Sequence, residues 1–383
     1  MSLEFDGANN KISNSSGASY GVALPAPNYR QPQPLIINGD MAVAQRATST
    51  ASITSDGFHT LDRFETHISS LGTWTQSQDS DVPSGQGFAN SLKMDCTTAD
   101  ASPSAGDFCI IRTKFEGQDL QLIKKGTANA EKLTLAFWVK SSKTGTHIVE
   151  LFDIDNSRTV SQAYTISSAD TWEKKVVNFP ADTTGAFGDD NGRSLDIQFW
   201  LGTGTTYSSG TLQTTWGGQS NGDRAVGQVN LADSDSNDFY LTGVQLEVGE
   251  YTSSTIPPFQ HESYQDNFLR CARYYTEYGG AADASFTANY DLLCEANGTS
   301  AFRNATFWTP VPLRAVPSIN NPTMVYFDYD TTTAETSAGT VTILGGGEIM
   351  SCVSIGGSGA ANLVDAKITG CRVAAVLTMD AEL

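Results

Sequence analysis

The sequence is poor in charged residues. Only 17% of its 383 residues are charged, whereas soluble globular domains usually reach about 25%. Gly, Ser, Thr, Asn and Asp are abundant instead, with 35 glycines, and aromatic residues make up 10%. This composition excludes a disordered chain and a coiled coil, because both need many more charged residues and fewer aromatic ones. It favours a globular, mainly β protein.

Basic residues are scarce. The 23 Lys and Arg against 42 Asp and Glu give a net charge of −19. This excludes a nucleic-acid-binding face and electrostatic docking on an anionic membrane, because both need clustered Lys and Arg. No run approaches 18 consecutive apolar residues, so we expect no membrane insertion. The start, residues 1–6, lacks the basic and apolar regions of a secretory signal, so we expect synthesis without a signal peptide.

Cysteine and histidine are too few and too scattered for a metal or disulfide framework. None of the six cysteines forms a CxxC pair, and none of the four histidines lies near a cysteine group. We expect reduced, buried thiols and no zinc. The sequence also lacks a Gly-x-Ser-x-Gly motif and a phosphate-binding loop, since the glycines at 345–347 are not followed by Lys-Ser or Lys-Thr. We therefore expect no enzymatic activity and no organic cofactor.

The pattern along the chain predicts four segments. Residues 1–34 have no sustained period and end in a proline-rich run, which is typical of an extended arm. Residues 35–260 hold short runs that alternate at period two, such as Leu133–Lys140 and Leu195–Leu201. These runs predict an antiparallel β-sandwich of the jelly-roll type. Residues 261–280 predict a connecting helix, and 281–383 a second, small β domain.

The predicted helix carries one apolar stripe. Ser263 and Asp266 fit a capping box, and Gly279-Gly280 is expected to end the helix. The stripe spans four residues at i, i+4, i+7 and i+11, namely Tyr264, Phe268, Cys271 and Tyr275. Two interpretations remain open: the stripe packs on its own sandwich, or it lines a three-fold axis against two other copies of the chain.

Several motifs, in order, resemble those of bacteriophage virion proteins of the tail-fibre type. Leu35–Arg46 is similar to that family's "INGxMxVxQR" opening, and Asp56–Phe64 to its "DG(Y/F)xxDRW" motif, with Phe64 in place of the more usual Trp. Leu133–Lys140 resembles its "LTLSFWVK" strand. Four later segments resemble the closing motifs and the C-terminal part of the family's sequences, namely Gly243–Gly249, Pro258–Tyr264, Leu269–Tyr275 and Val311–Ile319.

This resemblance implies a homotrimeric virion structural protein with a carbohydrate-binding-module-like jelly roll. Residues 1–34 would attach it to other virion proteins, and residues 281–383 would form a tip domain. The expected function is that of a tail fibre or fibre-like appendage on the tail or capsid surface, made in the host cytoplasm, which attaches to a host-cell glycan. The alternatives are a capsid-bound decoration or cement protein, a head fibre without glycan recognition, and a polysaccharide depolymerase.

Glycan binding needs an aromatic face beside hydrogen-bonding groups. Aromatic residues in polar, Gly-rich loops are better candidates than those in strands, and three fit: Trp74, Tyr207 and Trp216. The alternative role of each is packing beneath its loop. Because the protein is acidic, we expect its glycan to be neutral or bridged by a divalent cation.

Calcium is the one metal that the sequence favours, because Asp and Asn oxygens crowd three turns. The candidate ligands are Asp153, Asp155, Asp189, Asp190, Asp233 and Asp235. The alternative is that these are plain turns, since Asp, Asn and Gly form turns without any metal. A glycosidase would need two facing carboxylates, and the acids that could provide them are Glu150, Asp153, Asp155, Asp196 and Glu247.

Overall fold

The chain folds mainly into β-strands. A computed structural model describes residues 33–278 without a break and, outside them, the stretches 3–6, 11–14, 19–21, 291–296, 303–319, 324–328, 334–336, 342–343, 350–357, 369–373 and 377–383. The chain divides into two compact units, Met1–Leu35 and Ile36–Leu383. In the described residues, no helix is long and apolar enough to span a membrane.

The first unit is a small antiparallel sheet, which differs from the extended arm that the sequence predicts. Its strands are β1 (Leu3–Asp6), β2 (Lys11–Asn14) and β3 (Ser19–Gly21), in the order β1-β2-β3. Each strand is only three or four residues long, too short to show a period in the sequence, so only the pairing between them reveals the sheet. The proline-rich run at 25–32 lies outside the described residues.

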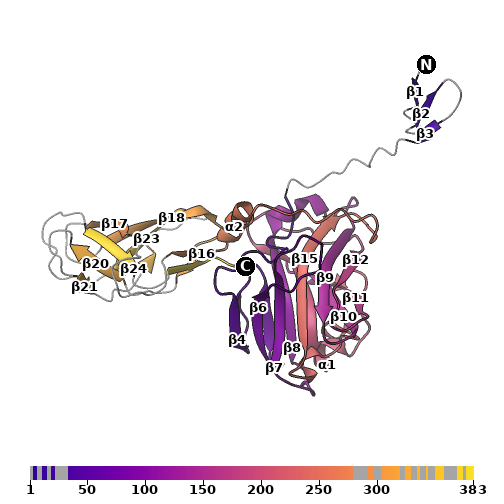
Figure 1. The fold of residues 1–383 in the computed structure, drawn as a ribbon, viewed down its shortest axis with the longest axis horizontal. Helices are drawn as coiled ribbons and strands as arrows, with labels where there is room; N and C mark the ends of the chain where they lie inside the picture. The colour runs from indigo at the N-terminus through magenta and orange to yellow at the C-terminus, as the bar shows by residue number, and fades with distance from the viewer. Residues whose placement is uncertain are drawn as a thin grey trace. The chain divides into compact units, whose positions relative to one another are not determined.

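The second unit contains two six-stranded antiparallel sheets (Figure 1). The first has the order β14-β11-β10-β13-β8-β5 and is built from Gly217–Gly218, Arg158–Ile166, Gly145–Asp153, Arg193–Thr203, Phe108–Glu116 and Glu65–Ser69. The second has the order β12-β9-β15-β7-β6-β4 and is built from Glu173–Phe179, Leu133–Ser141, Asp238–Val248, Ser91–Thr98, Thr73–Asp79 and Ser49–Ile53.

The two sheets pack face to face through side chains at alternate positions. Phe137 of β9 and Phe199 of β13 meet across the gap with ring centroids 5.1 Å apart at 83°. Both are fully buried, as expected for the inner faces of a sandwich. Consecutive strands cross repeatedly from one sheet to the other, as in a jelly roll. The predicted mainly β fold with an antiparallel sandwich is confirmed.

Short helical turns join the strands at the edges of the sandwich. They are η1 (Gly117–Ile123), α1 (Thr205–Ser208), η2 (Asn221–Asp223) and η3 (Leu231–Asp233). The segment from α1 to η3 folds back over the first sheet, since Ala225 N donates to Tyr207 O at 2.8 Å and Val229 N to Thr146 O at 3.0 Å. This segment supplies part of the candidate site described below.

The helix α2 (Tyr264–Ala272) begins where the sequence predicts and ends earlier. Ser263 Oγ accepts a hydrogen bond from the Asp266 amide at 3.1 Å, which confirms the capping box. The predicted continuation to Tyr278 is wrong, because Tyr275–Tyr278 forms strand β16 and pairs with β25 (Leu377–Asp380). The β-favouring residues Tyr-Thr-Glu-Tyr gain ladder hydrogen bonds there that a helix could not offer. The strand β19 (Ser318–Ile319) completes this three-stranded sheet.

A seven-stranded sheet accounts for the predicted second β region. Its order is β21-β20-β24-β17-β18-β23-β22, built from Ala334–Thr336, Met324–Asp328, Thr369–Val373, Asp291–Ala296, Arg303–Leu313, Met350–Gly357 and Thr342–Ile343. Four strand-like runs of the sequence, 301–308, 324–329, 340–344 and 371–379, contain or overlap these elements and β25. The last run is divided between β24 and β25.

The motifs that carry the family resemblance meet in one interlocked junction. Asn38 Nδ2 donates to the backbone carbonyls of Val43 and Asp62 at 2.8 and 2.9 Å. The backbone N–H of Asn38 donates to Asn267 Oδ1 of α2 at 3.0 Å. The guanidiniums of Arg46 and Arg63 lie over the rings of Tyr275 and Tyr274, at 3.6 and 3.4 Å from the centroids. These motif residues therefore dock α2 and β16 on the sandwich.

Candidate functional site

The outer face of the first sheet carries a row of polar side chains. The strand register places Ser161, Glu150, Gln198, Arg112 and Glu65 opposite one another on β11, β10, β13, β8 and β5. Residues opposite one another share a face, so the five side chains form one row across the strands. This face is the one turned away from the core of the sandwich.

Glu150 and Arg224 form the centre of the row. The Glu150 carboxylate is fully buried and accepts from Arg224 Nε and Nη2, both at 2.8 Å, and from Trp200 Nε1 at 3.3 Å. Arg224 Nη2 also donates to Gln198 Oε1 at 3.1 Å. Burial raises the pKa of Glu150, and the Arg224 charge offsets part of that rise. Arg224 reaches the sheet because the segment after η2 folds over it.

Two further ion pairs flank the centre. Arg193 donates to both oxygens of Asp196, from Nε to Oδ1 at 2.7 Å and from Nη2 to Oδ2. Arg112 holds Glu65 in a bidentate pair at 2.6 and 3.1 Å, and Lys114 Nζ lies 2.8 Å from the same carboxylate. Burial acts to raise the pKa of Glu65, but its bonds to Arg112 and Lys114 outweigh burial and lower the pKa to about 2.

An aromatic cluster lies at the end of the face beside α1. Trp200 is fully buried, and the half-buried rings of Phe108 and Tyr207 pack against it. The ring centroids of Phe108 and Tyr207 are 5.3 Å apart at an interplanar angle of 81°, and those of Tyr207 and Trp200 are 5.5 Å apart. His67 adds a fourth ring at 4.7 Å from Phe108, and its Nδ1 is 2.8 Å from Asp56 Oδ2. Burial lowers the pKa of His67, so it is neutral near pH 7.

The aromatic cluster and the polar row are continuous. The Arg224 guanidinium carbon lies 5.2 Å from the Trp200 centroid and 5.8 Å from the Tyr207 centroid. The rings of Phe108 and Tyr207 are half-buried, whereas Glu150, Gln198 and Arg224 are 0%, 1% and 8% exposed. The two rings are therefore the accessible part of this arrangement, and an apolar ring face of a ligand can stack on them.

Of the three aromatic residues predicted to bind glycan, the structure places one on this face. Tyr207 belongs to the cluster. Trp74 lies on strand β6 and not in the loop that the sequence suggests; it is fully buried, and its Nε1 donates to Leu71 O at 2.7 Å, so its role is packing. Trp216 is half-buried at the far edge of the sheet and donates from Nε1 to Pro180 O at 2.9 Å. The structure does not bring the three together.

Around Asp153, one of the predicted calcium ligands, the position expected for a metal ion is taken by the ammonium group of Lys125. Lys125 Nζ donates to the Asp153 carboxylate and to the carbonyls of Thr184 and Gly185 at 3.0 and 2.8 Å, and these oxygens form a cage around it. Asp182 Oδ2 lies 3.0 Å away, and both carboxylates are buried. Four oxygens therefore already surround one positive charge.

The other five predicted calcium ligands lie apart from one another or in ordinary turns. Asp155 accepts from the Gly188 amide and Asp190 from the Gly192 amide, at 2.9 and 2.8 Å, and Asp189 is exposed beside Asp190. Asp233 pairs with Lys143, and Asp235 is exposed. No three Asp, Glu, His or Cys side chains of the described part of the chain are grouped as metal ligands.

The predicted helix stripe is divided between the inside and the outside of the chain. Cys271 and Tyr275 are buried within the second unit, and Tyr275 lies on β16, not on the helix. Tyr264 is 63% exposed and stacks on Phe268 with centroids 6.2 Å apart. Packing on the chain's own sandwich therefore holds for the C-terminal half of the stripe, and only Tyr264 and Phe268 remain for a partner.

A separate open cavity of about 390 Å³ lies beside η1. Its lining includes Leu120, Phe187, Gln121 and Asn129, so it joins an apolar floor to a polar edge. Lys125 also lines it, but its ammonium is committed to the oxygen cage. The cavity lies apart from the aromatic cluster and shares no residue with it.

Sequence reasoning missed Arg224, Gln198 and Phe108 as site residues. Gln198 and Trp200 carry a signal, because they occupy the outward positions of the alternating run Leu195–Leu201. Arg224 carries none, since it follows an irregular Gly- and Asn-containing loop and reaches Glu150 only through the fold.

No protein-family model matches the chain, and no curated protein matches its sequence. Among solved structures, the chain is similar to the enzymatically active domain of tailspike protein 4 from bacteriophage CBA120, at 13% identity and a TM-score of 0.30. That match covers 56% of this chain and 21% of the tailspike chain, so this chain spans about a fifth of that relative. It is also similar to the family 11 carbohydrate-binding module of a Clostridium thermocellum cellulosomal cellulase, at 10% identity and a TM-score of 0.28, covering 53% and 99%.

Proposed function

We propose that this chain is a structural protein of a bacteriophage particle, a tail fibre or fibre-like appendage, which attaches to the host by binding a surface glycan without catalysis. The observation that carries the glycan-binding part is the aromatic cluster joined to the polar row on the outer face of the first sheet. The assignment to a virion rests on the ordered motifs of residues 35–320, several of which meet in the junction around Asn38.

The chemistry of the face favours a neutral glycan. The cationic groups of the row are each paired with a carboxylate, so this face carries no excess of positive charge. The whole chain carries a net charge of −19 and repels a polyanion. A neutral sugar meets no such electrostatic repulsion, and its apolar ring face can stack on Tyr207 and Phe108.

The absence of catalysis is proposed from the state of the three acids on this face. Hydrolysis of a glycosidic bond needs one protonated and one ionised carboxyl group, free to reach the substrate. Glu150, Asp196 and Glu65 are all buried, and each is held by an arginine. An acid in that setting serves to orient its arginine. Host glycans incubated with the protein should release no reducing ends, and release would remove this part of the proposal.

The substitution Tyr207→Ala tests glycan binding. Loss of one stacking ring is expected to weaken binding about tenfold, equivalent to about 1.4 kcal/mol. Glycan arrays identify the ligand, and calorimetry on the full chain measures the change. The matched control is Trp172→Ala, a half-buried aromatic residue beside β12 on the other sheet. Equal binding by both variants and the parent would place the glycan site elsewhere.

Imaging of labelled protein on intact particles separates a fibre from the capsid-decoration alternative. A fibre is expected at few, fixed positions, and its purified form should block host adsorption. Occupancy over the whole shell, with no effect on adsorption, would favour a cement protein.

A further inference from the structure

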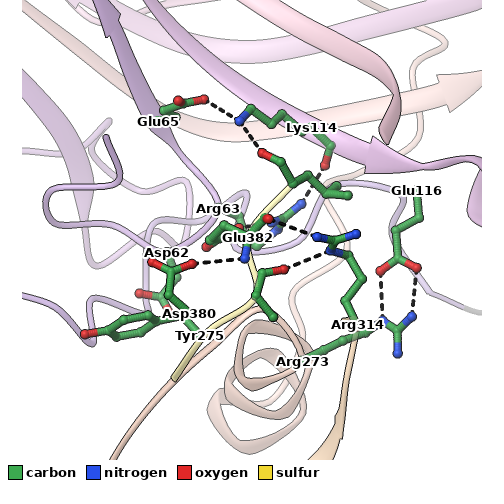
Figure 2. Close-up of polar contacts among 12 residues, drawn as sticks. Asp62, Arg63, Glu65, Lys114, Glu116, Arg273, Tyr275, Arg314, Asp380 and Glu382 are labelled. Carbon is green, nitrogen blue, oxygen red and sulfur yellow. Dashed lines mark hydrogen bonds and ion pairs between the residues drawn. The ribbon is translucent and has the colours of Figure 1, made fainter. Parts of the chain in front are cut away.

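Four cations from distant parts of the chain surround the last described segment. Arg46, Arg63, Lys114 and Arg314, here called the cationic cluster, face Asp380–Leu383, here called the acidic segment. Figure 2 shows Arg63, Lys114 and Arg314 beside Asp380 and Glu382. The acidic segment continues directly from β25. Lys114 also pairs with Glu65 of the polar row, so the cluster adjoins that face, but the contacts to the acidic segment have no part in the proposed function.

The cationic cluster binds both the side chains and the backbone of the acidic segment. Arg46 Nη2 lies 3.1 Å from Asp380 Oδ2 and 3.5 Å from Glu382 Oε1, and Arg63 pairs with the same glutamate. Arg314 donates from Nε to the carbonyl of Ala381 at 2.8 Å and from Nη2 to that of Glu382 at 3.0 Å. Lys114 donates to the backbone oxygen of Leu383. The cluster therefore binds both carboxylate groups and backbone carbonyls of the segment, as peptide-binding sites do.

Each cation is held in place by a second anchor that does not involve the acidic segment. Arg63 Nη2 donates to the Lys114 carbonyl at 2.6 Å, and its guanidinium stacks on Tyr274. Arg46 stacks on Tyr275. Lys114 pairs with Glu65 at 2.8 Å, and Arg314 Nη1 donates to Asn191 O at 3.0 Å. The cluster is therefore organised before the segment arrives, which lowers the ordering cost of binding.

The cluster also has donors to spare. Arg46 Nη1 and Arg63 Nε are buried and have no hydrogen-bond partner. The side chains of Arg46 and Arg63 are 10% and 1% exposed, and that of Glu382 is 6% exposed. Removing the segment would leave the buried Arg63 without a carboxylate, whereas Arg46 would keep Asp62, whose Oδ1 lies 3.9 Å from its Nη1. A buried cation without a counter-ion is strongly unfavourable. The cluster should therefore bind a carboxylate in preference to a neutral group.

We infer that the cationic cluster is a recognition site for an acidic peptide, and that its ligand in this chain is the acidic segment Asp380–Leu383. The bound segment fastens β25, and through it the three-stranded sheet β16-β25-β19, to the sandwich. The contact joins positions more than 60 residues apart in the sequence and combines ion pairs with backbone hydrogen bonds, including one from Ala381 N to Tyr274 O at 2.7 Å.

The test uses the full chain with Glu382→Gln, which removes the counter-ion of Arg63. Amide hydrogen exchange over residues 377–383 is expected to accelerate at least about tenfold. Glu250→Gln is the matched control, since Glu250 forms an exposed pair with Lys132 at 2.6 Å, and it should leave this exchange unchanged. If Glu382→Gln does not fold, Asp380→Asn gives the same test with a milder change, because that side chain is 41% exposed.

A synthetic peptide of residues 377–383 tests recognition directly. It is expected to bind the full-chain Glu382→Gln variant and to accelerate amide exchange of that variant's own residues 377–383 further, because it displaces them from the site. It should bind the parent protein much more weakly, because there the site is already filled. The same peptide with both acids replaced by their amides should not bind. Unchanged exchange in Glu382→Gln and Asp380→Asn would overturn the inference, as would equal binding of the acidic and amide peptides.

Discussion

Lys125 shows how one residue can take over a site that the surrounding sequence suggests for a metal. Its ammonium has two carboxylates and two carbonyls around it, and the rings of Phe187 and Trp216 lie 5.2 and 5.1 Å away. A divalent cation would meet the same oxygens and a positive charge already in place. The aspartate-rich turns predicted the oxygen-rich setting correctly, while the identity of the cation depended on a lysine nearly 30 positions earlier.

Replacing Lys125 with Met should destabilise the protein by about 3–5 kcal/mol, because the fully buried Asp153 would be left without its counter-ion, while Asp182 would keep Arg158 at 2.8 Å. Urea unfolding at neutral pH measures the change. Lys124→Met is the control, since its neighbour Lys124 pairs with Glu131 at the surface and should lose less than about 1 kcal/mol. Similar losses in the two variants would contradict the role of the cage. Calcium should not raise the melting temperature of the parent protein.

His147 is a buried base with one unsatisfied nitrogen. Its Nε2 lies 3.3 Å from the Lys143 carbonyl, which can only accept, so the proton sits on Nε2 and leaves Nδ1 without a partner. The ring stacks on Tyr164 in the sandwich interior. Burial lowers the pKa of His147 to about 4, whereas an unfolded histidine titrates near 6.5.

This pKa makes stability depend on pH with a defined sign. The unfolded chain takes up the proton first, so the contribution of His147 is complete above about pH 6.5 and is lost as the pH falls toward 4. The loss should amount to about 3 kcal/mol. Burial raises the pKa of Asp62 to about 7, so Asp62 makes the protein more stable as the pH falls, opposite to His147. The measurement is therefore the difference in free energy of unfolding between the parent and His147→Gln, from urea unfolding at pH 7.5 and at pH 4.5. A difference that is the same at both pH values would refute this expectation.

At the scale of elements, local signals located the beginnings of structures better than their ends. Ser263 and Asp266 define the start of α2 through a cap that involves only neighbouring residues. Its end at Ala272 depends on β25, which arrives from about 100 residues away and pairs with Tyr275–Tyr278. The glycan candidates follow the same division, since Trp74 and Trp216 lie in polar sequence but their indole nitrogens bond to nearby backbone. Only the folded sheet decides which loop aromatic faces outward.

At the scale of the whole molecule, the family resemblance predicts a homotrimer, and the structure leaves two residues for that role. Tyr264 and Phe268 stack on the exposed side of α2, and Tyr264 is the most exposed of the large apolar side chains in the described residues. An exposed aromatic pair gains by burial against copies of itself.

Light scattering on the purified full chain should give three times 40.9 kDa, and Tyr264→Glu should shift the protein toward the single-chain mass. The control Leu122→Glu changes another exposed apolar residue, on η1, and should keep the trimer. A parent protein that stays at 40.9 kDa at high concentration would contradict the homotrimer and weaken the fibre assignment.

The sequence by itself determined the fold class, the cap of α2, the scarcity of positive charge and most of the strands, because period-two alternation, capping and charge depend on residues close together in the chain. The tertiary structure alone decided that Arg224 reaches Glu150, that Lys125 fills an oxygen cage and that Glu382 lies between Arg46 and Arg63. Each of these contacts joins residues 28 to 336 positions apart. A buried charge selects its partner by proximity in space, and no local pattern records which distant residue the fold will bring to it.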